Sequence, residues 1–203
     1  MYIKINDLIS QFSVNSIALE RKTILQPLIE YIQIKKNNNE AILLNFICTH
    51  NSRRSHFSQV WAQTMSYYFN IKNVCCYSGG TEATAMFPKV VQTLINQGFN
   101  IQKLSEDENP VYAIKYSENE NPIICFSKIY NNEFNPKSNF AAVLTCSNAD
   151  EGCPMVLGGA DGRFPITYND PKQFDGTELM NEKYLERSLE IAQEMFYVFS
   201  NII

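Results

Sequence analysis

The chain has 203 residues, which is long enough for one domain with a sizeable hydrophobic core. Apolar residues make up 45% of it and charged residues 19%, which is typical of an ordinary globular protein rather than a disordered one. The net charge of -4 argues against broad nucleic-acid binding, although a small local anion site remains compatible with it. No apolar run approaches the length of a membrane span, and the N-terminus lacks the hydrophobic region of a signal peptide. We therefore expect a cytoplasmic protein that binds neither nucleic acid nor membrane.

Six cysteines raise the question of a disulfide framework or a zinc site. They are Cys48, Cys75, Cys76, Cys125, Cys146 and Cys153. In a chain of this size without an export signal, cysteines are expected to be buried, catalytic or redox-active. Zinc is disfavoured because there is no Cys-x-x-Cys pair and the histidines are only His50 and His56. We expect no bound metal and no bound cofactor.

The first 40 residues are predicted to be helical, because apolar side chains recur there at near-helical spacing. Pro27 is expected to kink or end a helix, and residues 35–39 form a polar linker. We assign residues 1–40 to an N-terminal helical extension that packs on a catalytic domain of residues 41–203.

The stretch that follows is predicted to form a strand, a short loop and a helix. An apolar run over residues 41–47 ends at Cys48, five residues separate it from Arg54, and a helix-forming segment continues to about residue 69. Such a loop points its backbone N–H groups at whatever lies at the helix N-terminus, and that place favours anions.

The Cys-x5-Arg spacing adds chemistry to this anion site. Loop amides, the helix N-terminus and Arg54 would supply the positive potential that a Cys48 thiolate needs. The planar fork of Arg54 can hold two oxygens of a tetrahedral oxyanion over the sulfur. Ser55 can hydrogen-bond the thiolate, and Asn51 can brace the loop. The alternative is a buried cysteine followed by a helix cap and two surface arginines; the flanking strand and helix favour the reactive loop.

The next elements follow the pattern of a parallel α/β sheet. A buried strand over residues 74–77 leads into a glycine-containing turn at 78–85, and a helix over 88–97 stops at Gly98. Residues 104–139 differ, since they are rich in Asn, Glu and Ser. We interpret them as a β-hairpin-like insertion that could extend the sheet.

A second reactive thiol is suggested further along the chain. The buried strand at 140–145 ends at Cys146, just as the first strand ends at Cys48, and ligands gather where parallel strands end. Cys153 follows across a polar spacer that would suit a loop able to fold back. The alternative is two unrelated cysteines near a surface loop.

Residues 158–168 are expected to be irregular, and residues 178–201 to form a last amphipathic helix. Between them, Pro171 holds Asp170 extended and aims its carboxylate outward. A carboxyl group near an oxyanion site can act as a general acid. A plain turn is the alternative, and without further context it is the better interpretation.

Four segments of the chain, in order, resemble the low-molecular-weight protein tyrosine phosphatase superfamily and, within it, the thioredoxin-coupled arsenate reductases. The segments are residues 48–55, 77–83, 146–154 and 170–171. The resemblance covers residues 41–103 and 138–203. Segment 146–154 discriminates between the two kinds of enzyme, because it looks like the redox cysteine pair of the reductases.

The resemblance implies a three-layer α/β fold with a four-stranded parallel sheet flanked by helices. It also implies Cys48 as nucleophile, Arg54 as oxyanion clamp, Asp170 as general acid and a thiol relay through Cys146 and Cys153. The remaining oxyanion-binding positions of the loop would be Thr49, His50, Asn51, Ser52, Arg53 and Ser55.

Two positions depart from the family pattern. Arg53 stands where these loops usually carry a small residue or cysteine, and an extra cation at the rim could alter substrate access. Lys172-Gln173-Phe174 follows Asp-Pro in place of the tyrosines typical of phosphatase substrate recognition, which weakens the phosphotyrosine interpretation.

Three functions are compatible with these observations. The leading hypothesis is reduction of arsenate to arsenite, with thioredoxin as partner and electron donor. The alternative is a low-molecular-weight protein tyrosine phosphatase or related phosphomonoesterase, in which Cys146 and Cys153 are a redox switch or a relic. The third is a non-enzymatic protein that binds an oxyanion or docks a partner.

Overall fold

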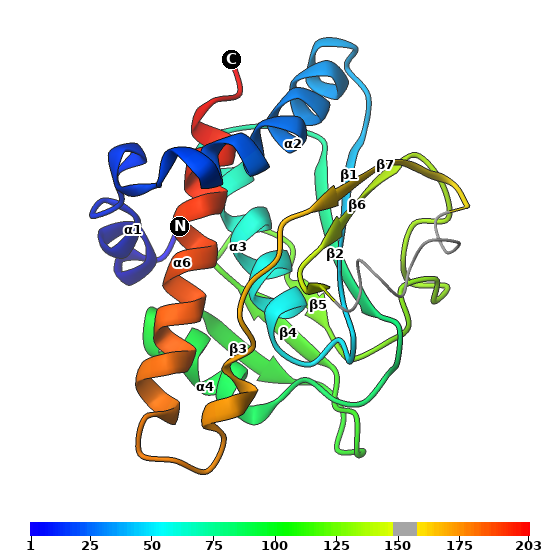
Figure 1. The fold of residues 1–203 in the computed structure, drawn as a ribbon. Coiled ribbons are helices and arrows are strands. Elements are labelled where there is room, and N and C mark those ends of the chain that lie inside the picture. Colours follow the sequence, from blue (N-terminus) through cyan, green and yellow to red (C-terminus); the bar gives the residue numbers. More distant parts are fainter. Residues whose placement is uncertain (148–157) are drawn as a thin grey trace.

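A computed structural model describes residues 1–147 and 158–203, and it is built around a four-stranded parallel sheet (Figure 1). In order across the sheet, the strands are β2 (Val74–Gly80), β1 (Ile42–Cys48), β6 (Phe140–Leu144) and β7 (Ala160–Pro165). Each strand runs parallel to its neighbours. The expected α/β fold, a four-stranded parallel sheet flanked by helices, is confirmed.

Five α-helices are present among the described residues. They are α1 (Ile3–Ile9), α2 (Leu19–Asn37), α3 (Arg54–Tyr68), α4 (Pro88–Gln97) and α6 (Met180–Ser200), with one-turn helices η1 (Val14–Ser16) and η2 (Pro171–Phe174) between them. Helices α3 and α6 cover the face of β1 that carries Phe46, which shares one buried core with Trp61 of α3 and Met195 of α6. Helix α4 ends where its sequence predicts, because Gly98 adopts a left-handed φ of 106°.

Residues 104–139 form a hairpin, as expected, but they do not extend the parallel sheet. Strands β4 (Tyr112–Lys115) and β5 (Ile123–Cys125) pair antiparallel, and β3 (Asn100–Lys103) joins them in a separate three-stranded sheet. A single bridge between Gly80 and Ile129 connects the insertion to the edge of β2.

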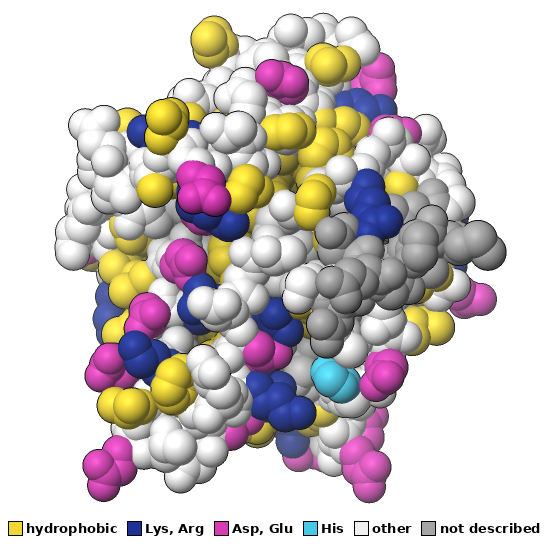
Figure 2. Space-filling view, in the orientation of Figure 1, with side chains coloured by type: hydrophobic (Ala, Val, Ile, Leu, Met, Phe, Trp, Pro, Cys, Tyr) yellow, Lys and Arg dark blue, Asp and Glu magenta, His cyan; other side chains and the backbone are white. Residues whose placement is uncertain are grey.

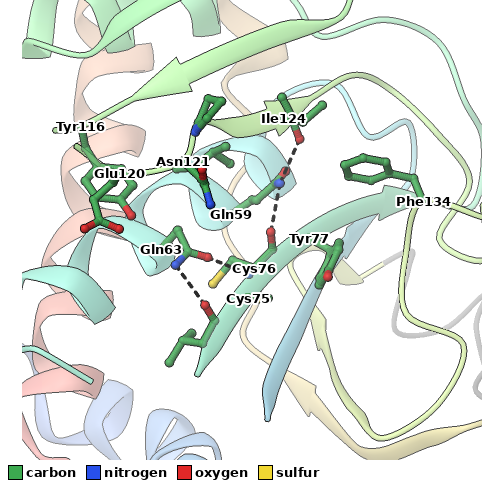
Figure 3. A pocket seen from close by; sticks show the side chains of 13 residues that line it. Gln59, Gln63, Cys75, Cys76, Tyr77, Tyr116, Glu120, Asn121, Ile124 and Phe134 are labelled. Carbon is green, nitrogen blue, oxygen red and sulfur yellow. Dashed lines mark hydrogen bonds between the residues drawn. The ribbon is translucent and has the colours of Figure 1, made fainter. Parts of the chain in front are cut away.

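The outer edge of β2 is closed by side-chain amides from α3, which explains why the hairpin stays apart (Figure 3). Gln63 donates to the Val74 carbonyl at 3.1 Å and accepts from the Cys76 amide at 2.9 Å. Gln59 donates to the carbonyls of Cys76 at 3.1 Å and Ile124 at 3.2 Å. A fifth strand would need these backbone groups. The space between β2 and β5 is instead a cleft of about 310 Å³.

The prediction that residues 158–168 are irregular is wrong, because residues 160–165 form β7. This strand pairs with β6 at the sheet edge, with a register shift between Phe140 and Ala141. Its sequence, ADGRFP, has neither a continuous apolar run nor a regular alternation. An edge strand that is only partly buried needs neither an apolar run nor an alternation of apolar and polar residues, so its sequence did not predict a strand.

The N-terminal helices pack on the same core as the sheet. Their buried apolar residues are Ile5, Ile9, Leu25, Leu28, Ile29 and Ile32. Of the two alternatives for Pro27, a kink or a helix end, the helix end is wrong, since α2 continues through it. Pro27 lies on the exposed side of α2, where water can satisfy the carbonyl that proline leaves free. None of the helices in the described ranges is both long enough and apolar enough to cross a membrane.

Candidate active site

The loop between β1 and α3 turns its carbonyl groups outward. Three of these carbonyls accept from backbone amides: Cys48 from Thr81 at 3.1 Å, Thr49 from Glu82 at 2.8 Å and Ser52 from Phe87 at 3.0 Å. The His50 carbonyl accepts from two hydroxyl groups, Thr84 Oγ1 at 3.1 Å and Ser127 Oγ at 2.9 Å. The N–H and C=O of one peptide plane point in opposite directions. The N–H groups of Thr49, His50, Asn51 and Arg53 therefore point toward the inside of the loop, which makes it a cradle for an oxyanion.

Asn51 braces this cradle from below. It adopts a left-handed φ of 45°, which asparagine tolerates better than most residues. Its side chain accepts from the Lys128 amide at 2.9 Å and donates to Ser55 Oγ at 2.9 Å. Because Ser55 accepts that bond, its own hydroxyl hydrogen is free to point at Cys48 Sγ, 3.1 Å away. The arrangement would stabilise a Cys48 thiolate.

Gly80 lets the loop approach β2. A Cβ atom there would lie 2.6 Å from Thr49 O and 2.7 Å from Asn51 N, which is closer than real contacts allow. The sequence predicted a turn beginning at residue 78, whereas β2 continues through Gly80. The glycine therefore serves close approach rather than a turn with positive φ.

Arg54 and Asp170 lie together, although they are far apart in the chain. Arg54 Nη2 is 2.5 Å from Asp170 Oδ2, and Nη1 donates to the Tyr168 carbonyl at 2.9 Å. The other oxygen of Asp170 accepts from the Lys172 amide at 3.0 Å and caps η2. The buried Nε of Arg54 has no hydrogen-bond partner among the residues that are described. The structure thus places a guanidinium and a carboxyl group beside the Cys48 loop.

No protein-family model matches the chain, and no curated protein matches it. Solved structures do match it. A low-molecular-weight protein tyrosine phosphatase from T. tengcongensis is 16% identical over 79% of this chain and 99% of that chain, with a TM-score of 0.53. The chain has the low-molecular-weight protein tyrosine phosphatase fold.

Two further solved structures are similar to the chain. A YwlE mutant from Bacillus subtilis is 14% identical over 79% of this chain and 97% of that chain, with a TM-score of 0.54. An arsenate reductase in a phosphate-binding state is 16% identical over 80% of this chain and 99% of that chain, with a TM-score of 0.49. At identities this low, the structural similarity to the two proteins with TM-scores above 0.5 shows the fold alone, and the reaction has to be argued from the site.

A second thiol lies close to the loop of this phosphatase fold. Cys146 is 2% exposed and shares a small buried cluster with Cys48, which is 4% exposed. Thr49 Oγ1 is 3.5 Å from Cys146 Sγ. The Thr145 amide donates to the Ile47 carbonyl at 2.7 Å, so β1 and β6 end side by side. Cys153, and with it the second half of the predicted relay, lies outside the described residues.

The Arg53 side chain does not join the cradle. It donates to Tyr184 Oη and Asp175 Oδ2, both at 2.6 Å, and its guanidinium lies 4.2 Å from the centroid of the Phe87 ring. The sequence suggested that this cation would sit at the rim and contact the oxyanion. The guanidinium instead binds Tyr184 of α6 and Asp175, which follows η2. The backbone N–H of Arg53 is the group that it contributes to the cradle.

Two buried groups around the Cys48 loop escaped the sequence analysis. His56 is fully buried beside Ser78, and burial, reinforced by the charge of Lys128, lowers the pKa of His56 to about 3. Burial also lowers the pKa of Lys128 to about 8, and its ammonium group lies over the rings of Phe126 and Phe134. No local sequence pattern predicts that Lys128 is buried, because the rings that surround its ammonium group come together only when the insertion folds.

In the described surroundings of the loop there is neither a cluster of metal-ligating side chains nor, on the face drawn in Figure 2, a basic patch. Within residues 1–147 and 158–203, no group of three or more His, Cys, Asp or Glu side chains could hold a metal. On the described part of the face drawn in Figure 2, basic and acidic side chains are interspersed rather than gathered into one basic patch. An oxyanion would therefore be recognised by the loop and Arg54, and not by a broad positive surface.

Proposed function

We propose that the protein is a thiol-dependent arsenate reductase that uses Cys48 as its nucleophile. The observation that carries this proposal is the buried Cys146 thiol, which contacts Thr49 of the Cys48 loop and shares a buried cluster with Cys48. Hydrolysis of a phosphoester has no step for a second thiol beside the nucleophile. Reduction needs one, because two electrons must leave the protein.

In the first step, arsenate binds to the loop N–H groups and to Arg54, which exchanges its Asp170 partner for the oxyanion. The Cys48 thiolate attacks arsenic, an S–As bond forms and one As–O bond breaks. Asp170, in its protonated form, gives a proton to the departing oxygen, which leaves as water. Ser55 donates to the sulfur before attack, from 3.1 Å.

In the second step, Cys146 loses its proton and attacks the Cys48 sulfur. An S–S bond forms, the S–As bond breaks, and its electron pair stays on arsenic, so that As(V) leaves as arsenite. Cys153 then attacks Cys146, moves the disulfide to the 146–153 pair and frees the Cys48 thiolate. Thioredoxin is our proposal for the dithiol that reduces this last disulfide.

A phosphatase is the second candidate, and one observation favours it. Arg54 follows Cys48 by six residues in the strand–loop–helix unit and pairs with Asp170, and a cysteine, an arginine and an aspartate in these roles would suffice for phosphoester cleavage through a cysteinyl phosphate. Loss of the alcohol and hydrolysis by water would complete that reaction. Cys146 would then have no part in turnover.

The deciding experiment compares arsenate reduction with phosphoester cleavage in the same variants. Arsenate-dependent NADPH oxidation is measured with thioredoxin and thioredoxin reductase, and p-nitrophenyl phosphate cleavage is measured alongside. The variants are Cys48→Ser, Cys146→Ser and Cys153→Ser, with Cys75→Ser as the control because Cys75 is an exposed thiol away from the loop.

The reductase proposal expects the first three variants to abolish arsenate turnover and the control to retain it. Only Cys48→Ser should abolish phosphoester cleavage. If wild-type protein cleaves the phosphoester and leaves arsenate untouched, the phosphatase takes the place of the reductase. If it turns over neither, while phosphate still binds, the protein is an oxyanion-binding protein.

A further inference from the structure

Two adjacent arginines of the loop hold the two ends of one segment, residues 168–175. Arg54 binds the beginning of this segment, through the Tyr168 carbonyl and the Asp170 carboxylate. Arg53 binds its end, through the Asp175 carboxylate at 2.6 Å. The segment between them contains only the four-residue helix η2 (Pro171–Phe174). A single turn of helix has little stability of its own, so its position depends on tertiary contacts, and the two arginines supply one at each end beside the packing of η2 on α6.

The contact at Arg53 is a closed cluster. Arg53 donates to Tyr184 Oη and to Asp175 Oδ2, and Tyr184 donates to Asp175 Oδ1, each at 2.6 Å. Phe87 lies against the guanidinium, 4.2 Å from ring centroid to Cζ, and its ring stacks on that of Tyr184 at 5.7 Å. The Arg53 side chain is 11% exposed, so water screens these charges weakly.

The contact at Arg54 cannot persist during the proposed reaction. Arg54 must bind the substrate oxyanion, which competes for the same guanidinium that Asp170 occupies in the free protein. Asp170 must also carry a proton to act as an acid, and a neutral carboxyl group no longer attracts Arg54 as an ion. Substrate binding therefore releases the beginning of the segment at the moment when Asp170 has to be in place.

We propose that Arg53 is a positioning residue, which holds the segment through Asp175 and Tyr184 while Arg54 changes partner and keeps Asp170 beside the departing oxygen. This inference rests on the proposed first step at Cys48. In that step the proton of Asp170 moves to the departing oxygen as the S–P or S–As bond forms and the bond to that oxygen breaks. The side chain of Arg53 does not touch the substrate, which distinguishes it from the side chain of Arg54.

The test uses aryl phosphates, because thiolate attack on the oxyanion is common to both candidate reactions. A poor leaving group such as phenol needs the proton from Asp170, whereas 2,4-dinitrophenol leaves readily as an anion. Arg53→Met should lower kcat for phenyl phosphate by about tenfold or more and change that for 2,4-dinitrophenyl phosphate less than about twofold. Asp175→Asn should act in the same direction.

Two controls separate positioning from a general loss of structure. Asp170→Asn should give the same leaving-group dependence, and adding Arg53→Met to it should cost nothing further, because the acid is already absent. Ser188→Ala removes a hydrogen bond from Trp61 in the core, away from the segment, and should lower stability without any leaving-group dependence. An Arg53→Met variant that slows both substrates equally, or that adds its full effect to Asp170→Asn, would overturn the proposal.

Hydrogen exchange provides a readout that needs no turnover. The Lys172 amide donates to Asp170 and the Asp175 amide to the Lys172 carbonyl, at 3.0 Å each, so both report on the segment. With saturating phosphate, wild-type protein should keep these amides protected and Arg53→Met should exchange them at least about tenfold faster. Equal protection of these amides in the two proteins would refute the positioning role of Arg53. Absence of all turnover in wild type, with the difference in exchange intact, would refute only the proposed function.

Discussion

His56 follows Ser55 in the first turn of α3 and is fully buried. Its Nδ1 lies 3.3 Å from Ser78 Oγ, and the Ser78 hydroxyl donates to Gln59 Oε1 at 2.6 Å. Ser78 has one hydrogen, so it can only accept from His56, which places the imidazole proton on Nδ1. The buried Nε2 has no hydrogen-bond partner in the described part of the chain. The loop is thus supported by a neutral histidine.

This histidine should make the protein sensitive to acid. Its folded-state pKa is lowered to about 3, first by burial and then by the charge of Lys128, whereas the unfolded-state value is about 6.5. The unfolded chain therefore binds the proton more readily, so stability is complete above pH 6.5 and falls as the pH drops toward 3. Between pH 7.5 and pH 5.0 the loss should be about 2 kcal/mol.

Urea unfolding at the two pH values measures this effect. His56→Asn retains an N–H donor toward Ser78 and cannot titrate, so wild type should lose about 2 kcal/mol more than the variant between pH 7.5 and pH 5.0. The same pH dependence in both proteins would assign the acid sensitivity to other groups.

Among the elements, the insertion has the clearest structural role at the site. Its segment from residue 126 to residue 130 runs beside the loop and supports it from outside. The Ser127 hydroxyl donates to the His50 carbonyl at 2.9 Å and accepts from the Thr84 amide at 2.8 Å, and the Lys128 amide donates to Asn51. The insertion therefore braces the back of the cradle.

Ser127→Ala tests this brace. The substitution removes one of the two hydrogen bonds to the His50 carbonyl and the side-chain partner of the Thr84 amide, so we expect a loss of about 1 kcal/mol in the free energy of unfolding and weaker phosphate binding. Ser138→Ala, at an exposed serine of the same insertion, is the matched control and should change neither. Chemical denaturation and phosphate titration by calorimetry give the two quantities. Unchanged phosphate affinity in Ser127→Ala would show that the cradle holds without the insertion.

For the molecule as a whole, the two N-terminal helices share the buried core of the sheet. Arg21 of α2 forms a two-point ion pair with Glu194 of α6, at 2.7 Å for each bond, and Glu194 is only 4% exposed. Removing α2 would take away the cation that pairs with this carboxylate. The predicted division of the chain at residue 40 stays a prediction until the two parts are separated.

A chain shortened to residues 38–203 should fail to fold. The six buried apolar side chains of α1 and α2 contribute about 1.5–3 kcal/mol each, a sum of about 9–18 kcal/mol that is as large as the whole stability of a typical domain. Circular dichroism and gel filtration should find an unfolded or aggregated protein. A monomeric fragment with a cooperative melting transition would establish residues 41–203 as an independent domain.

How much of this structure the sequence foretold depends on how local each signal was. The strand before Cys48, the helix after Arg54 and the end of α4 at Gly98 were predictable, because hydrophobic periodicity and a glycine cap act over a few residues. The edge strand β7 was not predictable, because its pairing with β6 makes it a strand and its own composition carries no strand pattern.

The candidate site divides in the same way. The sequence by itself determined the loop, since Cys48, Asn51, Arg54 and Ser55 lie within eight consecutive positions of one strand–loop–helix unit. Only the tertiary structure decided that Arg54 meets Asp170 and that Arg53 turns away to Asp175. The physical reason is that ion pairs and buried environments between distant residues exist only after packing has chosen which surfaces meet, and no local pattern encodes that choice.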